Sequence, residues 1–279
     1  MRIERSQSVT IWMQGGLGNQ LFQLNAGFHA STSVKAPLRI SRVSYLHNRL
    51  RRYEIRSMTP DVSHESLIEG LYIGSPYSDG EPATETPRGR LRIRTSIKDV
   101  EGPGDLLLGF FQDQASVAYS STPVTSRLSM VRLSRAGSRV ANIARGAVVA
   151  HVRRGDYAVT TAAKSMFGEL STRYYREALE ALGASLTETV FFTDDVAHVM
   201  RDFGVPRTSV IGSADLASPL ETVAVMGLAG SIVIPNSTFS WWASELVRRC
   251  GRVVAPQRWF LDRPEEFSPA RSDWIRVAN

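Results

Sequence analysis

The sequence contains little cysteine and little lysine, and it has no long apolar run. Cys250 is the only cysteine among the 279 residues, so the chain cannot close an internal disulfide and offers no cysteine pair for redox or zinc chemistry. No apolar stretch approaches the roughly 20 residues that cross a bilayer, and residues 1–16 lack the apolar core of a signal peptide. We therefore expect a cytoplasmic protein without a transmembrane segment.

Several common catalytic signatures are also missing. The sequence has no Walker lysine loop, GxSxG elbow, HExxH or CxxC, which excludes P-loop kinases, α/β-hydrolases, zincins and zinc ribbons. GGLGNQ at 15–20 is only superficially similar to a dinucleotide-binding turn, because Leu21 stands where the third glycine belongs and no acidic residue follows about 20 positions later. A Rossmann dehydrogenase is disfavoured, although this tight turn still brings the amide of Asn19 within reach of a ligand.

Arginine supplies nearly all of the positive charge. The chain has 33 Lys and Arg residues against 27 Asp and Glu residues, a net charge of +6, and lysine occurs only at positions 35, 98 and 164. The planar guanidinium fork matches phosphate oxygens. No zinc-finger spacing, RNP-like aromatic segment or long basic tail accompanies the charge. Nucleic-acid binding is therefore a background hypothesis beside a phosphorylated small molecule, and we expect no nucleic-acid partner.

The length and the order of apolar segments predict an α/β fold in two domains with a cleft. A chain of 279 residues is longer than one average domain, and 43% hydrophobic residues suffice to bury a sizeable core. From Ala147 onward, buried strands alternate with helices, which predicts a parallel, doubly wound sheet with ligands at the carboxyl ends of its strands. We place the boundary in the polar helical stretch before Arg145, giving domains 1–140 and 141–279.

Polar residues follow four of these predicted strands. They are His151 to Asp156, Asp194 and Asp195, Asp215, and Asn236 to Ser240. The last group opens a helix, whose start presents free backbone N–H groups and the positive end of the helix dipole, and the hydroxyls of Ser237 and Thr238 add donors. Arg153, in phase with His151, is the arginine that we expect to face the cleft. The strand ends therefore predict a diphosphate site.

Other interpretations of these residues stay open. Ser237 and Thr238 also suit simple helix caps, with Trp242 packed inward as core. Asp156 either fixes an arginine or acts as a base. The arginine-rich segment 36–56 is typical of a solvated helical face, with a substrate-binding surface as the alternative.

Six motifs together resemble the bacterial α-1,2-fucosyltransferases of glycosyltransferase family 11. They are GGLGNQLFQ at 15–23, GFFQD at 109–113, HVRRGDY at 151–157, FFTDD at 191–195, IPNSTFSWWASEL at 234–246 and APQRWF at 255–260. The resemblance implies a GT-B architecture, in which two Rossmann-like domains face each other across a cleft. It also implies an inverting transfer of L-fucose, or a related sugar, from a GDP-sugar to a glycan or small glycoside, such as the 2-hydroxyl of a galactoside.

The resemblance also implies roles for individual residues. Arg153 grips the β-phosphate of the donor, and Asn19 reaches the donor from the N-terminal, acceptor-side domain. The C-terminal domain holds most of the GDP-sugar, and no metal or other cofactor is needed. The implied donor-binding residues are Asn19, His151, Arg153, Asn236, Ser237, Thr238 and Phe239.

Some features are not settled by these motifs. Asp156 is the nearest candidate for the general base, and Asp215 is a positional candidate for the acceptor of the guanine N–H protons. The segment 218–230 lacks the basic residues that the family usually shows there. An alternative is a GDP-sugar mutase that interconverts pyranose and furanose rings, with Mg²⁺ or Mn²⁺ on Asp194 and Asp195. The motifs specify neither the acceptor nor the oligomeric state.

Overall fold

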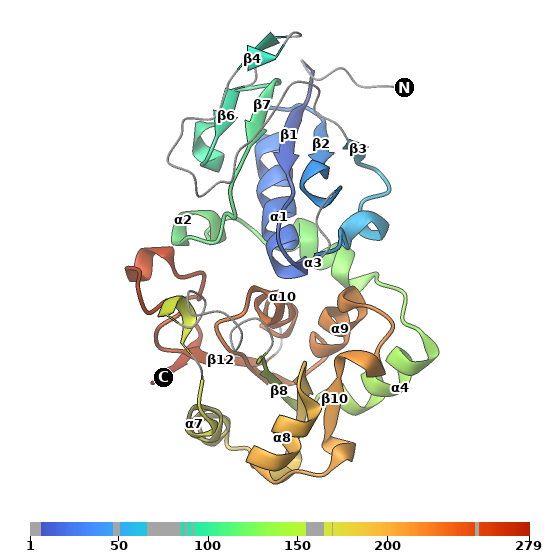
Figure 1. Cartoon of the computed structure of the whole chain (residues 1–279), viewed down its shortest axis with the longest axis vertical. Helices are drawn as coiled ribbons and strands as arrows, with labels where there is room; N and C mark the ends of the chain where they lie inside the picture. The colour runs from blue at the N-terminus through green and yellow to red at the C-terminus, as the bar shows by residue number, and fades with distance from the viewer. Residues whose placement is uncertain are drawn as a thin grey trace. The chain divides into compact units, whose positions relative to one another are not determined.

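The structure, a computed structural model, describes residues 7–46, 51–65, 85–86, 89–90, 92–154, 165–168, 170–248 and 251–279. The chain forms two compact units, Met1–Phe111 and Gln112–Asn279, and each is built on its own parallel sheet (Figure 1). The predicted α/β class with two Rossmann-like units is therefore confirmed. That the two units face each other across a cleft remains a prediction.

The first unit holds a five-stranded parallel sheet in the order β3-β2-β1-β7-β6. Its strands are β1 (Val9–Trp12), β2 (Leu38–Ser41), β3 (Ser63–Glu65), β6 (Arg92–Arg94) and β7 (Asp105–Leu107), and β4 (Glu85–Thr86) pairs separately with β5 (Gly89–Arg90). Helix α1 (Leu17–Ser33) packs on β1 and β2. Gly27 permits this close packing, because an added Cβ would lie 2.9 Å from Leu38 Cδ1.

Strand β2 corrects the helical interpretation of residues 36–56. All four of its residues are buried, including Arg39, whose Nη1 atom lies 2.6 Å from Glu65 Oε1 on the neighbouring strand. An arginine inside a buried strand interrupts the apolar pattern that identifies strands in a sequence. Short 3₁₀ turns follow in this unit: η2 (Val43–Tyr45), η3 (Ile55–Met58) and η4 (Ile97–Asp99).

The second unit holds a six-stranded parallel sheet in the order β10-β9-β8-β11-β12-β13. The strands are β8 (Val148–Val152), β9 (Thr189–Thr193), β10 (Val210–Gly212), β11 (Ser231–Val233), β12 (Arg252–Pro256) and β13 (Ile275–Val277). Numbered within the unit, this is the order 3-2-1-4-5-6 of the doubly wound nucleotide-binding fold. The chain reverses its direction of travel across the sheet between β8 and β11, so that pair marks the topological switch point.

Helices cover both faces of the second sheet (Figure 1). Ala150 and Val152 of β8 belong to the core cluster that includes Tyr175 of α7, whereas His151, in opposite phase, contacts Phe239 of α10. No helix in the described part of the chain is both long and apolar enough to cross a membrane. The helices are α2 (Gln114–Val117), α3 (Thr122–Ser129), α4 (Arg135–Ala144), α7 (Thr172–Leu182), α8 (Val196–Phe203), α9 (Pro219–Met226) and α10 (Thr238–Val247), and the 3₁₀ turns are η5 (Leu186–Glu188), η6 (Arg207–Ser209), η7 (Ser213–Asp215) and η8 (Glu265–Phe267).

The compact units divide after Phe111, earlier than the boundary after residue 140 that the sequence suggested. Helices α3 and α4 pack on α9, and α3 also packs on α10, so this helical stretch joins the second unit. A buried carboxylate strengthens the attachment: Glu221 Oε1 accepts a 2.5 Å hydrogen bond from the backbone N–H of Ser134, directly before α4. The assignment of acceptor and donor to different domains remains a prediction.

Candidate active site

The candidate site lies at the switch point of the second sheet, where β8 and β11 end side by side. The chain leaves β8 through Arg153 and Arg154, and it leaves β11 through Pro235 to Ser237 into α10. In open parallel sheets, ligands bind beside the carboxyl ends of strands at this point. The structure thus brings these two predicted polar groups to neighbouring strand ends, and a third, at Asp194, follows β9 on the other side of β8.

Arg153 is held by a residue that follows β9, the strand on the opposite side of β8 from β11. Its Nη1 atom lies 3.5 Å from Oδ2 of Asp194, which follows β9, and the exposed fractions of the two side chains are 24% and 22%. Oδ1 of the same Asp194 accepts a 2.8 Å hydrogen bond from the backbone N–H of Arg154. One carboxylate therefore fixes both the guanidinium and the backbone that carries it, at a position that is partly open to solvent.

His151, two residues before this arginine and within β8, is held as a neutral base. The side chain is 4% exposed, and Nδ1 has no hydrogen-bond partner among the residues that the structure describes. Burial, together with the nearby charge of Arg153, lowers the pKa of His151 to about 3 against the opposing effect of Asp194. The ring lies 5.7 Å from the ring of Phe239 between centroids. The end of β8 and the start of α10 are thus joined by the ring contact between His151 and Phe239. Within the described residues, Nδ1 of His151 makes no hydrogen bond.

The start of α10 has the form expected of an anion site. Ser237 is the N-cap residue with extended backbone, and its side chain makes no capping hydrogen bond. The first N–H groups of a helix have no partner within the helix, and the dipole is positive there. Simple capping by Ser237, one of the open interpretations, is therefore not what the structure shows. The predicted inward packing is confirmed for Trp242, which is completely buried.

Asn236 ties the turn before α10 to two other segments. Its Nδ2 atom donates to the carbonyl oxygens of Phe167 at 2.5 Å and of Trp259 at 3.1 Å. Its side chain is buried. Asn236 was predicted to bind the sugar donor, but its side-chain N–H groups position the turn before α10.

Two adjacent tyrosines of α7 support both strand ends from the opposite face of the sheet. The hydroxyl of Tyr175 donates to the carbonyl oxygen of His151 at 3.2 Å, and that of Tyr174 donates to the carbonyl oxygen of Ile234 at 2.6 Å. Burial raises the pKa of Tyr174 well above its ordinary value, so its hydroxyl keeps the proton that it donates. Sequence reasoning treated these tyrosines only as part of a helix, although a YY pair on the buried face was a usable signal.

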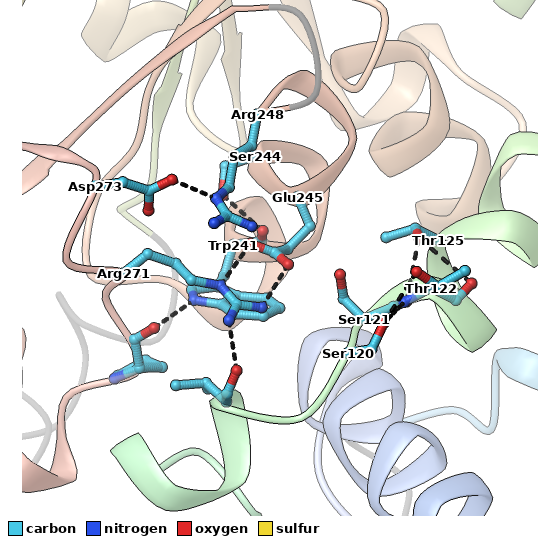
Figure 2. Close-up of polar contacts among 12 residues, drawn as sticks. Ser120, Ser121, Thr122, Thr125, Trp241, Ser244, Glu245, Arg248, Arg271 and Asp273 are labelled. Atoms are coloured by element: carbon cyan, nitrogen blue, oxygen red, sulfur yellow. Dashed lines mark hydrogen bonds and ion pairs between the residues drawn. The ribbon is translucent and has the colours of Figure 1, made fainter.

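Helix α10 is anchored at its far end by a buried ion pair (Figure 2). Arg271 binds Glu245 with both arms of its fork, at 2.9 Å and 2.6 Å, and donates a third hydrogen bond to the carbonyl of Val117 at 2.5 Å. Its Cζ atom lies 5.1 Å from the centre of the Trp241 ring, whose N–H donates to the carbonyl of Pro269 at 2.7 Å. This network joins α10, α2 and the C-terminal segment.

Other candidate residues have contacts away from the switch point. Asp195 caps α8 by accepting from the N–H of His198 at 2.9 Å. Asp215, in η7 beyond the edge strand β10, accepts two 2.9 Å hydrogen bonds from Arg207 and one from the N–H of Gly212 at 2.7 Å. Asp156, the candidate base, lies outside the described residues.

In the first unit, Asn19 lies at the start of α1, immediately after the glycine turn. Gly15 has φ +79°, and an added Cβ would meet Asn19 Nδ2 at 2.5 Å. Gln20 Nε2 donates to the carbonyl of Gly15 at 3.2 Å, Tyr45 donates to the same carbonyl at 2.8 Å, and Gln23 accepts from the N–H of Gln14 at 3.0 Å. The glutamines of the GGLGNQLFQ motif therefore hold the turn, a role that sequence reasoning missed.

These features define a doubly wound α/β unit whose switch point carries an arginine after β8 and the start of α10 after β11. The profile of glycosyl transferase family 11 matches residues 107–278. The chain belongs to this family and is a glycosyltransferase of the fucosyltransferase-like class.

Individual relatives and solved structures extend the comparison. The chain is 24% identical to an alpha-1,2-colitosyltransferase of Escherichia coli over 287 aligned residues, covering 95% of this chain and 97% of that protein. It is 31% identical to the O-antigen biosynthesis glycosyltransferase WbnK of Escherichia coli over 131 residues, covering 46% and 43%. The structure is similar to fucosyltransferase NodZ from Bradyrhizobium, with a TM-score of 0.47, 13% identity and coverage of 86% and 93%. It is also similar to POFUT1, with a TM-score of 0.45, 12% identity and coverage of 91% and 99%.

Proposed function

We propose that this chain moves L-fucose, or a related sugar, from a GDP-sugar to a hydroxyl group of a glycan or small glycoside, with inversion at the anomeric carbon. The observation that carries the proposal is that Arg153, paired with Asp194, follows β8 next to β11, the strand that leads into α10, whose N-cap Ser237 makes no side-chain capping bond. The alpha-1,2-colitosyltransferase similar to this chain supports an α-1,2 linkage. The cytoplasm is the expected location of the reaction.

The diphosphate of the donor lies between the two strand ends in this proposal. Arg153 and the first amides of α10 bind its oxygens, with the hydroxyls of Ser237 and Thr238 as further donors. Phe239 and the unused Nδ1 atom of His151 face the nucleoside side of the donor. Donor contacts by Asn19, Asn236 and Asp215 belong to the same proposal as expectations from the family resemblance.

The chemical step breaks the bond between the anomeric carbon and the β-phosphate oxygen. The acceptor hydroxyl oxygen forms the new bond from the opposite side, its proton passes to a carboxylate, for which Asp156 is the candidate, and GDP leaves with the bonding electron pair. Negative charge grows on the β-phosphate as this happens. A guanidinium and helix amides that strengthen their contacts at that moment lower the barrier. The proposed step draws its positive charge from these groups and uses no metal ion.

The test is incubation with GDP-fucose, with and without a galactoside acceptor, followed by NMR of the anomeric protons. The expected result is a new glycosidic signal of inverted configuration and an equal amount of free GDP, only when acceptor is present. A failure to consume GDP-fucose or another GDP-sugar with any acceptor would contradict the proposal.

The same experiment separates the transferase from the mutase alternative. A mutase would rearrange the sugar ring of the GDP-sugar without acceptor and without release of GDP. The structure does not favour that reaction, because Asp194 is engaged by Arg153 and by the N–H of Arg154, and Asp195 caps α8. No group of three or more metal-binding side chains occurs in the described part of the chain.

A further inference from the structure

Helix α4 and the connections at its two ends expose a concentrated positive charge. Between positions 127 and 145 the sequence has five arginines and no acidic residue, a local charge of +5 in a chain whose total is +6. Four of these arginines are exposed, and none of the four has an ion-pair partner among the residues that the structure describes. They are Arg132, Arg135, Arg139 and Arg145.

The packing of α4 turns this charge toward solvent. Gly137, Val140, Ala141 and Ala144 form its buried face, and the helix packs on α9. Arg135, Arg139 and Ile143 follow at intervals of four residues, which places them along one exposed face. The acidic residue that contacts the start of α4 is Glu221 of α9. It is buried, and it accepts hydrogen bonds from the backbone N–H groups of Ser134 and Ala217. The exposed face therefore keeps its full positive charge.

Two large apolar side chains stand among the arginines. Ile143 is 50% exposed, and Met130, at the end of α3, is 75% exposed. Both belong to the few large hydrophobic side chains that are exposed in the described part of the chain. Exposed cations together with exposed aliphatic groups match a surface that offers negative charge above a hydrocarbon layer.

We propose that this face of α3 and α4, the arginine face, docks on the surface of a bilayer that contains anionic lipids. The arginines bind lipid phosphates, and Ile143 and Met130 enter the headgroup region, while the apolar side of α4 stays packed on α9. A nucleic acid fits less well, since single-stranded sites use aromatic stacking platforms and no Phe, Tyr or Trp occurs between 120 and 156. A second copy of this chain fits less well too, because two such faces would repel each other. This proposal does not depend on the donor or acceptor assigned above.

The test is co-sedimentation of the full chain with vesicles of phosphatidylcholine alone and of phosphatidylcholine with about 30 mol % phosphatidylglycerol. We expect binding only to the anionic vesicles, and release at about 0.5 M NaCl because salt screens the attraction. The double variant Arg135→Gln/Arg139→Gln should weaken this binding by roughly tenfold or more. Ile143→Ser should weaken it with little change in its salt dependence.

The matched control is Arg173→Gln/Arg201→Gln, which removes two exposed arginines from α7 and α8 of the same unit. It should bind vesicles like the unchanged chain, and circular dichroism checks that every variant is folded. Equal vesicle binding by the arginine-face and control variants would overturn the proposal. So would an absence of vesicle binding with retention on a single-stranded RNA column, or dimerisation that Ile143→Ser abolishes.

Discussion

A guanidinium stabilises a leaving phosphate most effectively when it is already held in position before the reaction. Asp194 supplies that support, because one of its oxygens faces Arg153 and the other accepts from the backbone of Arg154. The contact between Arg153 and Asp194 is 3.5 Å long, and both side chains are partly exposed to solvent, where an ion pair is weak. The residue that orients the arginine is thus an aspartate from the next strand.

Loss of the guanidinium should damage the reaction more than the fold. We predict that Arg153→Ala raises the activation free energy by about 3 kcal/mol or more, as expected for one preorganised donor to a developing negative charge. Arg153→Lys should restore only part of the rate, because an ammonium lacks the planar fork. Steady-state kcat/KM with GDP-fucose and acceptor measures both. Arg173→Ala is the control, and equal rates for Arg153→Ala and this control would count against the assigned role.

His151 should make folding stability depend on pH. Its pKa is about 3 in the folded chain, against about 6.5 in an unfolded one, so the unfolded chain binds a proton that the folded chain does not. Stability from this residue is complete above about pH 6.5 and declines as the pH falls toward 3. We predict that Tm falls less steeply between pH 7 and pH 4 for His151→Gln than for the unchanged chain. Parallel Tm profiles would show that His151 is not held neutral by the fold.

At the scale of elements, helix α7 supports the ends of β8 and β11 by hydrogen bonds. The adjacent hydroxyls of Tyr174 and Tyr175 reach one carbonyl on each side of the switch point. Each carbonyl belongs to the last residues before a predicted phosphate contact. Helix α7 therefore positions Arg153 and the start of α10 together.

Removal of the Tyr175 hydroxyl should affect both the folding stability and the binding of the β-phosphate, and two measurements distinguish these effects. Tyr175→Phe leaves the carbonyl of His151 without its donor and should cost about 1–3 kcal/mol of unfolding free energy. We also predict a larger loss of affinity for GDP than for GMP, since only GDP carries the β-phosphate that Arg153 binds. Calorimetry with both nucleotides measures the ratio. Tyr53→Phe, which loses a 2.8 Å hydrogen bond to His64 in the first unit, is the control, and an unchanged GDP to GMP ratio in Tyr175→Phe would contradict the positioning role.

At the scale of the whole molecule, the second unit is closed by contacts between distant parts of its sequence. Arg271 joins Glu245 of α10 to the carbonyl of Val117 in α2 (Figure 2). Gln114 also donates to the carbonyls of Ser268 and Ala270, at 2.6 Å and 3.1 Å. The first helix and the last segment of the second unit are therefore tied to each other and to α10, whose start forms part of the candidate site.

We predict that Arg271→Gln lowers the unfolding free energy by about 3–5 kcal/mol, because it leaves the buried carboxylate of Glu245 without its partner. The double variant Arg271→Gln/Glu245→Gln should recover part of this loss, since it removes the uncompensated charge. Chemical denaturation of the single and double variants measures the difference. A double variant less stable than Arg271→Gln would show that the penalty is not one of unpaired charge.

The sequence predicts the second unit better than the first. Buried strands from Val148 to Pro256 alternate with helices, and four of the strand ends carry the polar groups that the sequence analysis singled out. Strand β2 was missed because Arg39, which pairs with Glu65, hides its apolar pattern. The compact units divide earlier than the predicted boundary: polar helices α3 and α4 resemble a linker in composition, although their narrow apolar faces pack on α9 and α10.

The candidate site was predictable as a set of strand ends but not as a set of contacts. Arg153, His151 and Ser237 were predicted because their residue types and positions suit a phosphate. The contacts of Asp194, Tyr174 and Tyr175 were not predicted, because pairing across 24 to 60 residues depends on which strands are neighbours. Strand order is the information that the local pattern lacks.

The central claim is that a nucleotide diphosphate binds where β8 and β11 end. A crystal structure of the full chain with GDP tests it most directly. The expected result is a β-phosphate within hydrogen-bond distance of the Arg153 guanidinium and of the first backbone N–H groups of α10. Density for GDP with its phosphates away from both Arg153 and Ser237 would contradict the claim.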